Sequence, residues 1–274
     1  MFGDHETSSL GWDGHLLLLH WSEVERRSGL AAWVRRGLEN DEKVIYTEAD
    51  DGTSRRSVRS VLEDNGIDVV AATAEGRLSV LPVAEFYPPG GQAEVVEKAL
   101  AEGYRAVRMS AEARAARTVL SEHAYAAYER HMGRLCRTLP LSALCQYDRE
   151  YAAGQRLPGV AEAHVDGIRE RQLDISGSDG ELTLAGEIDI SNEDLLEWAL
   201  RAATKKASAT FWLDLSRVTF LSGGGCRALL VGTRHFRHQG GYVLLVACPA
   251  STERILRLLG LDRVTGLELV GADP

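Results

Sequence analysis

The chain has 274 residues, of which 45% are hydrophobic and 26% are charged, and it carries a formal net charge of −9 at pH 7. This composition is ordinary for a globular protein and supplies enough apolar material for one large or two ordinary domains. The negative charge argues against nonspecific binding to nucleic acids, whose phosphates require clustered Lys and Arg.

The cysteines and the first residues bear on the cellular compartment. None of the four cysteines stands in a C-x-x-C pair, so neither a zinc ribbon nor a redox dithiol is indicated. The acidic start, MFGDHETSS, lacks the basic region of a signal peptide. No apolar run approaches the roughly 18 residues that a membrane helix needs. We therefore expect a cytoplasmic protein with reduced thiols and no membrane contact.

Strand-like and helix-like segments alternate in the first half of the chain. Short apolar runs predict strands at 15–21, 43–49, 106–110 and 142–148, and two more within 69–82, around Glu75-Gly76. Helical spacing and capping residues predict helices at 23–38, 51–66, 91–104 and 112–138. This alternation predicts an α/β fold whose mainly parallel sheet is covered by helices on both faces.

A Gly- and Pro-containing break at 151–164 separates this half from a second, smaller one. The pattern of 171–191 predicts a hairpin of two alternating strands. Beyond it, buried strands are predicted at 210–216 and 242–248, and helices at 192–206, after the Gly-rich turn near residue 222, and at 249–260. We place the domain boundary near residue 170, which gives domains of 1–168 and 169–274.

Three motifs follow one another in the second half: AGEIDIS, then WLDLSRVTFLSGGGCRALL, then GGYVLLVACPASTERILRLLGLDRV. Together they resemble the STAS domain of the anti-sigma factor antagonist family over nearly all of 173–270. The resemblance implies a small α/β domain that docks onto a kinase-like anti-sigma factor or another protein of a STAS pathway. The implied partner-binding residues are Ser222, Gly223, Gly224, Gly225 and Cys226.

This chain departs from the STAS family at the docking turn. The family usually has Asp-Ser-Ser-Gly where this chain has Ser222-Gly223-Gly224-Gly225. The second Ser of that pattern is the usual phosphoacceptor, and its place is taken by Gly224, which has no hydroxyl. Ser222 stands at the family's Asp position and is the alternative acceptor.

The first half is similar to the MEDS domain, the sensory domain of methanogen and methylotroph DcmR proteins. The matching pieces are GHLLLLH, RRGLENDEKVIYTEA, GYRAVRMSAEA, AYERHM and SALCQYDREY followed by His164, over roughly 14–168. The resemblance implies a RecA/KaiC-like fold that has lost its nucleotide chemistry and serves as a sensor. The family often opens with His-x-Cys-x-x-Tyr, whereas this chain has His15, Leu17 and His20.

Five polar residues near predicted strand ends and helix starts form a candidate ligand pocket: His15, His20, Glu112, Cys145 and His164. Open α/β sheets bind ligands at such positions, and histidine is a common ligand group. The competing interpretation is the ordinary polar edge of a buried sheet. Since the five residues lack the tight spacing of a metal-binding motif, we predict no metal and no cofactor.

No phosphate-binding G-x-x-x-x-G-K-[ST] loop, nucleophile elbow, metalloprotease helix or kinase signature occurs in the sequence. We therefore predict no catalytic residues and a non-enzymatic signalling regulator. In this regulator the STAS domain binds a partner protein, and the first domain senses a small molecule or mediates assembly. Two alternatives stay open. One is a nucleotide-binding switch or weak NTPase that uses the RecA-like domain, and the other is a scaffold whose STAS domain forms homo-oligomers.

Overall fold

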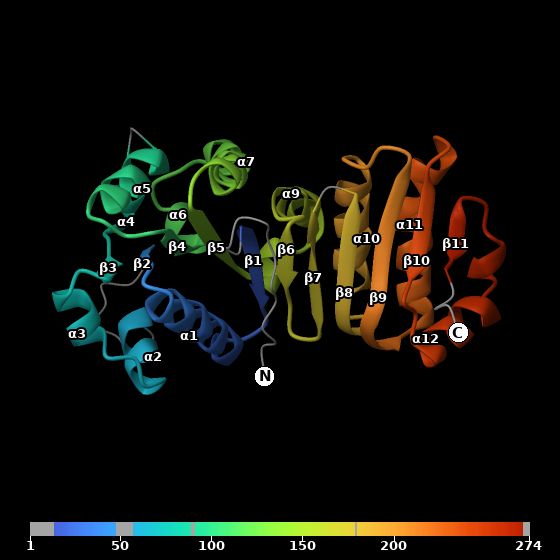
Figure 1. Cartoon of the computed structure of the whole chain (residues 1–274), viewed down its shortest axis with the longest axis horizontal. Coiled ribbons are helices and arrows are strands. Elements are labelled where there is room, and N and C mark those ends of the chain that lie inside the picture. The colour runs from blue at the N-terminus through green and yellow to red at the C-terminus, as the bar shows by residue number, and fades with distance from the viewer. Residues whose placement is uncertain (1–13, 48–56, 89–90, 179, 271–274) are drawn as a thin grey trace. The chain divides into compact units, whose positions relative to one another are not determined.

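The computed structural model describes residues 14–47, 57–88, 91–178 and 180–270 (Figure 1). Contacts divide the chain into two compact units, Met1–Tyr151 and Ala152–Pro274, so this division falls before the predicted boundary at 168/169. The acidic start at 1–13 and the beginning of the helix predicted at 51–66 lie outside the described residues.

The first unit contains a parallel sheet. Its strands lie in the order β1-β5-β4-β2-β3, and each neighbouring pair is parallel. The central strands are buried along almost their whole length, as expected for a sheet covered on both faces. The strands are β1 (His15–His20), β2 (Lys43–Thr47), β3 (Leu78–Val80), β4 (Val107–Glu112) and β5 (Leu141–Asp148).

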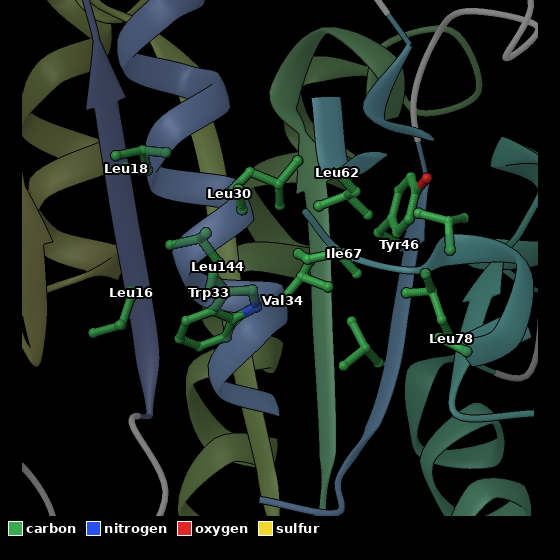
Figure 2. Close-up of a cluster of buried hydrophobic side chains, with 14 residues drawn as sticks. Leu16, Leu18, Leu30, Trp33, Val34, Tyr46, Leu62, Ile67, Leu78 and Leu144 are labelled. Carbon is green, nitrogen blue, oxygen red and sulfur yellow. The ribbon is translucent and has the colours of Figure 1, made fainter. Parts of the chain in front are cut away.

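Helices pack on both faces of this sheet and create two separate cores. Because side chains alternate along a strand, Leu16 and Leu144 join the core beneath α1, α2 and α3, whereas Ala143 joins the core beneath α4, α5 and α7. Figure 2 shows the first core, in which Trp33 and Leu30 of α1 lie against the sheet. The helices are α1 (Glu23–Glu39), α2 (Val58–Asp64), α3 (Val69–Ala74), α4 (Val83–Phe86), α5 (Gln92–Ala101), α6 (Ala113–Ala116), α7 (Glu122–Thr138) and α8 (Arg149–Ala152). The predicted mainly parallel, doubly covered sheet is confirmed.

Two predictions for the first unit are wrong in detail. The segment 69–82 contains a helix, α3, and one strand, β3, rather than two strands. The Asp68 side chain caps α3 by accepting a hydrogen bond from the Ala71 amide at 2.9 Å, and the alanines that follow favour a helix. The helix predicted at 112–138 is two helices, because Ser121 caps a new one through the Ala124 amide.

The second unit contains a mixed sheet in the order β11-β10-β9-β8-β7-β6. The predicted hairpin is present: β7 pairs antiparallel with β8, and also with β6, while β8 to β11 are parallel to their neighbours. The strands are β6 (Gly167–Arg169), β7 (Leu173–Ser178), β8 (Glu181–Ile188), β9 (Thr210–Leu221), β10 (Tyr242–Val246) and β11 (Leu267–Leu269).

Helices complete the second unit, and the predicted break at 151–164 is itself mostly helical. In α9 the residues Leu157, Val160 and Ala161 are buried at helical spacing, and this helix packs on α10. Helix α11 packs on α10 as well, where Gly232 permits close approach: a Cβ there would lie 2.8 Å from the Leu200 Cβ. The helices are η1 (Gly154–Arg156), α9 (Leu157–Ala163), α10 (Glu193–Thr204), α11 (Gly223–His238), α12 (Ala250–Leu258) and η2 (Leu261–Arg263).

Among the described residues, no helix combines the length and the apolar character that crossing a membrane would require.

Candidate functional site

A cluster of polar side chains lies inside the first unit, between the sheet and α7. It consists of His15 from β1, Cys145 from β5 and Glu129 from α7, all of which are buried. Strands β1 and β5 are neighbours, with Leu17 opposite Cys145 in register. Side chains alternate between the two faces along a strand, so His15 lies on the same face of the sheet as Leu17 and Cys145. The side chains of His15 and Cys145 both point toward α7.

The polar atoms of the cluster are close to one another. The Cys145 Sγ lies 3.4 Å from the His15 Nε2 and 3.3 Å from the Glu129 Oε2. The His15 Nε2 lies 3.2 Å from the same Glu129 oxygen. The other carboxylate oxygen, Oε1, accepts a hydrogen bond of 2.7 Å from the Tyr147 hydroxyl. Glu129 is therefore held at both oxygens, as a buried carboxylate must be.

Tyrosine rings enclose this cluster. The rings of Tyr125 and Tyr128 stack with centroids 5.8 Å apart, and Tyr125 lies 6.2 Å from Tyr147. Burial, with a further contribution from the Glu129 charge, raises the pKa of the Tyr147 hydroxyl and of the Cys145 thiol well above their ordinary values. Both groups are therefore protonated at neutral pH, and the rings keep the cluster out of bulk solvent.

A second polar network lies on the opposite face of the sheet, around Arg26 of α1. Its guanidinium pairs with the Glu112 carboxylate at 2.8 Å and contacts the Gln146 side-chain oxygen at 3.4 Å. The Gln146 amide in turn donates to the Ser110 hydroxyl at 2.9 Å. Burial, and then the nearby Arg26 charge, lowers the pKa of His20, which keeps this imidazole neutral at pH 7.

Those residues of the predicted ligand pocket that lie in the first unit are divided between the two faces of its sheet. His15 and Cys145 lie together on the α7 face, whereas Glu112 and His20 accompany Arg26 on the α1 face. His164 belongs to the second unit, where its Nδ1 lies 2.8 Å from the Val160 carbonyl oxygen.

Glu129 was absent from the predicted pocket, although the sequence contains a signal for it. It stands on the buried stripe of α7, whose other members are Tyr125, Met132 and Cys136. An acidic residue at helical spacing within such an apolar stripe must find a buried partner.

In the second unit, the turn between β9 and α11 contains the predicted docking residues. Ser222 caps α11: its hydroxyl accepts from the Gly225 amide at 3.0 Å, and its own amide donates to the Ile188 carbonyl at 2.9 Å. Gly225 is buried, and a Cβ there would lie 2.6 Å from the Ile188 Cγ2, so this position needs glycine for packing. The turn is thereby fixed to the end of β8.

The five predicted docking residues differ in accessibility. Gly223 is exposed, and Ser222 and Gly224 are half-buried, whereas Gly225 and Cys226 are buried. The Cys226 thiol belongs to the core, and burial raises its pKa to about 11. Only the first three residues present atoms to a partner in this conformation.

An exposed apolar side chain, missed by the sequence analysis, projects from the neighbouring loop after β8. Ile190 is 85% exposed. Its loop is pinned by hydrogen bonds: the Asp189 carboxylate accepts from the Ser191 amide at 2.8 Å, and the buried Asn192 side chain donates to the Glu187 carbonyl at 2.9 Å. A rigid loop thus holds an apolar residue near the carboxyl ends of β8 and β9.

Two protein families match the chain, one in each part. Residues 14–165 match the model of MEDS, the methanogen/methylotroph, DcmR sensory domain. Residues 172–271 match the model described as Mlab, STAS domain. No curated protein matches the chain.

Solved structures similar to part of this chain include anti-sigma factor antagonists. One from Mycobacterium paratuberculosis is 28% identical, and the match covers 35% of this chain and 83% of that one, with a TM-score of 0.31. The antagonist SpoIIAA in its unphosphorylated form is 14% identical over 36% and 88% of the two chains, with a TM-score of 0.31. The phosphorylated Bacillus cell fate determinant SpoIIAA is 14% identical over 36% and 91%, with a TM-score of 0.29.

Proposed function

The chain belongs to the MEDS sensory family and carries a STAS domain after its sensory domain, and from this membership we infer that it is a signalling regulator whose STAS domain binds a partner protein. The proposed partner is an anti-sigma factor or another protein of a STAS pathway. The proposed role of the MEDS domain is to sense a small molecule. The chain acts without catalysis in this proposal, and its proposed compartment is the cytoplasm.

The observation that carries the partner-binding proposal is the surface formed by Ser222, Gly223 and Ile190. The backbone of Gly223 is exposed beside the cap of α11, and the Ile190 side chain is 85% exposed on a loop that hydrogen bonds hold in place. Exposed apolar groups on a rigid frame bind partners at low entropic cost. We call this the Ser222 surface.

Control of binding is proposed to lie in the MEDS domain rather than in the docking turn. Gly224 stands at the position that the STAS resemblance assigns to the phosphoacceptor, and it has no hydroxyl. For the MEDS domain we propose a RecA/KaiC-like fold, which its doubly covered parallel sheet supports. The proposed sensory residues are still His15, His20, Glu112, Cys145 and His164, of which the first four are divided between two faces of the sheet.

The test is a binding measurement with two matched variants. A partner is first captured from the native host with the tagged chain, identified by mass spectrometry and purified. Ile190→Asp should then weaken its binding at least tenfold, because it places a charge on the Ser222 surface. Leu258→Asp on α12, at an 81% exposed position, should leave binding unchanged. Equal binding by wild type and Ile190→Asp would overturn this docking surface.

The two alternative functions are separated by two further measurements. Calorimetry with ATP and GTP should detect no binding, and light scattering should report the same mass for wild type and Ile190→Asp. Nucleotide binding or turnover would favour a nucleotide switch. A homo-oligomer that Ile190→Asp dissociates would favour the scaffold.

A further inference from the structure

The His15–Glu129–Cys145 cluster combines three kinds of ligand atom that together suit a transition metal. It offers an imidazole nitrogen, a carboxylate oxygen and a thiol sulfur, from residues that are 0%, 3% and 5% exposed. Burying such groups is costly unless hydrogen bonds or a metal ion satisfy them. The sequence analysis predicted no metal, because the three residues of this cluster come from separate helices and strands and form no sequence motif.

The spacing of these atoms agrees with a tetrahedral zinc site. Bond lengths of about 2.3 Å to sulfur and about 2.0–2.1 Å to nitrogen and oxygen place pairs of tetrahedral ligands about 3.3–3.6 Å apart. The separations here are 3.4 Å for Sγ to Nε2 and 3.3 Å for Sγ to Oε2, within this range, and 3.2 Å for Nε2 to Oε2, just below it. We propose that His15, Glu129 and Cys145 bind one Zn²⁺ ion in the MEDS domain.

Charge balance favours this ion in a buried site. A Zn²⁺ ion bound by the Cys145 thiolate, the Glu129 carboxylate and a neutral His15 imidazole gives a net charge of zero. The thiol proton leaves as the sulfur binds the metal, so each ion taken up releases one proton from Cys145 to solvent.

The surroundings of the cluster orient its carboxylate. The Tyr147 hydroxyl donates to the Glu129 Oε1 at 2.7 Å, which leaves the Oε2 directed at His15 and Cys145. Such outer contacts are a regular part of metal sites and tune their affinity. This inference goes beyond the proposed function and does not depend on the STAS partner.

The experiment uses the full chain, stripped with a chelator and titrated with Zn²⁺ and with Co²⁺. We expect one ion per chain by elemental analysis and, with cobalt, a thiolate-to-cobalt charge-transfer band with the visible bands of a tetrahedral ion. Cys145→Ser should remove the charge-transfer band. Cys226→Ser, at an equally buried thiol outside the cluster, should keep it. Tyr147→Phe should keep the band and weaken zinc binding about 10–100-fold.

If Cys145→Ser fails to fold, variants of the other three cysteines identify the thiolate that binds cobalt. The charge-transfer band should survive the separate replacement of Cys136, Cys226 and Cys248 by Ala, which leaves Cys145 as its source. A folded wild-type chain that takes up neither zinc nor cobalt would overturn the site and show an ordinary hydrogen-bonded core network. Cobalt binding without a charge-transfer band would also overturn the proposed site. So would loss of the band when one of the other three cysteines is replaced.

Discussion

The carboxylate of Glu193, in the first turn of α10, fills the space beside Gly224 in which a side chain at that position would stand. A Cβ added to Gly224 would overlap the Glu193 Oε2. The other oxygen, Oε1, pairs with the Arg227 guanidinium at 2.9 Å. The position at which the STAS resemblance expects a phosphorylated serine therefore faces the Glu193–Arg227 ion pair.

The first prediction concerns a charge introduced at this turn. Gly224→Asp should lower the free energy of unfolding by about 1–2 kcal/mol, since like charges in contact repel and the Glu193–Arg227 pair must rearrange. Adding Glu193→Gln should recover most of that loss. Urea denaturation of the three proteins measures both effects. Gly223→Asp is the matched control, because a Cβ there meets open space. An equal loss for Gly223→Asp and Gly224→Asp would contradict the assigned role of Glu193.

The second prediction concerns an ion pair in the core of the first unit. Arg108 and Glu42 form a salt bridge with both side chains 1% exposed, and the Arg108 guanidinium lies 4.2 Å from the centroid of the Trp33 ring. Glu42→Ala should cost about 3–5 kcal/mol of stability, because it removes the carboxylate that forms a salt bridge with a buried guanidinium. Chemical denaturation followed by circular dichroism measures the loss.

Two further variants test that explanation. Arg108→Met combined with Glu42→Leu should be more stable than Glu42→Ala alone, since the double variant buries no charge. Arg59→Ala removes the exposed pair with Glu63 and should cost less than about 1 kcal/mol. A loss for Glu42→Ala as small as that for Arg59→Ala would show that solvent screens the buried pair.

Local pattern accounts for the elements that could be predicted from the sequence. The four leucines of HLLLLH form a continuous apolar run, and the segment is a buried strand. The Gly-rich turn after Ser222 and the helix that follows it are contiguous in sequence, so both could be predicted as local structure. Prediction failed where local signals were ambiguous. In 69–82, β-branched residues and alanines stand side by side and favour different structures, and the N-cap provided by Asp68 stabilises a helix there.

The buried cluster shows why a site can be harder to predict than its elements. Cys145 is separated by 130 positions from His15 and by 16 from Glu129, so no motif connects them. Their meeting depends on β1 pairing with β5 and on which face α7 covers. The same alternation separates Glu112 from Cys145, although the sequence alone placed both in one pocket.

The third prediction concerns the pH dependence of a single thiol. Cys248 is half-buried, and burial, followed by the charges of Glu253 and Asp214, raises its pKa to about 11. A raised thiol pKa means that the reactive thiolate is scarce at neutral pH and grows about tenfold per pH unit. The alkylation rate of Cys248 should therefore climb steadily between about pH 7 and pH 10 and level off near 11.

Peptide mass spectrometry after timed iodoacetamide treatment measures this rate. Glu253→Gln removes a negative neighbour and should speed the reaction at pH 8. Cys226, with a pKa also raised to about 11 but only 1% exposed, should stay protected throughout the range. A Cys248 rate that is already maximal at pH 7 would contradict the assigned environment.

The fourth prediction decides where the second domain begins. Helix α9 lies before the predicted boundary at 168/169, yet it packs on α10 and buries Leu157, Val160 and Ala161. Strand β6 likewise pairs with β7. Of two fragments, 152–274 should be the more stable, because 169–274 exposes the apolar residues of α10 that α9 covers. Burying one Leu or Val side chain contributes roughly 1.5–3 kcal/mol, so the longer fragment should melt several degrees higher.

The comparison has a built-in control for chain length. A version of 152–274 with Leu157→Asp and Val160→Asp keeps the length but cannot pack α9, and it should melt near the temperature of 169–274. Both fragments should unfold in a single cooperative transition if the STAS strands form an independent core. Equal melting temperatures for 152–274 and 169–274 would assign α9 to the sensory domain and place the boundary at residue 168, because the contacts of α9 with α10 would then add no stability to the STAS domain.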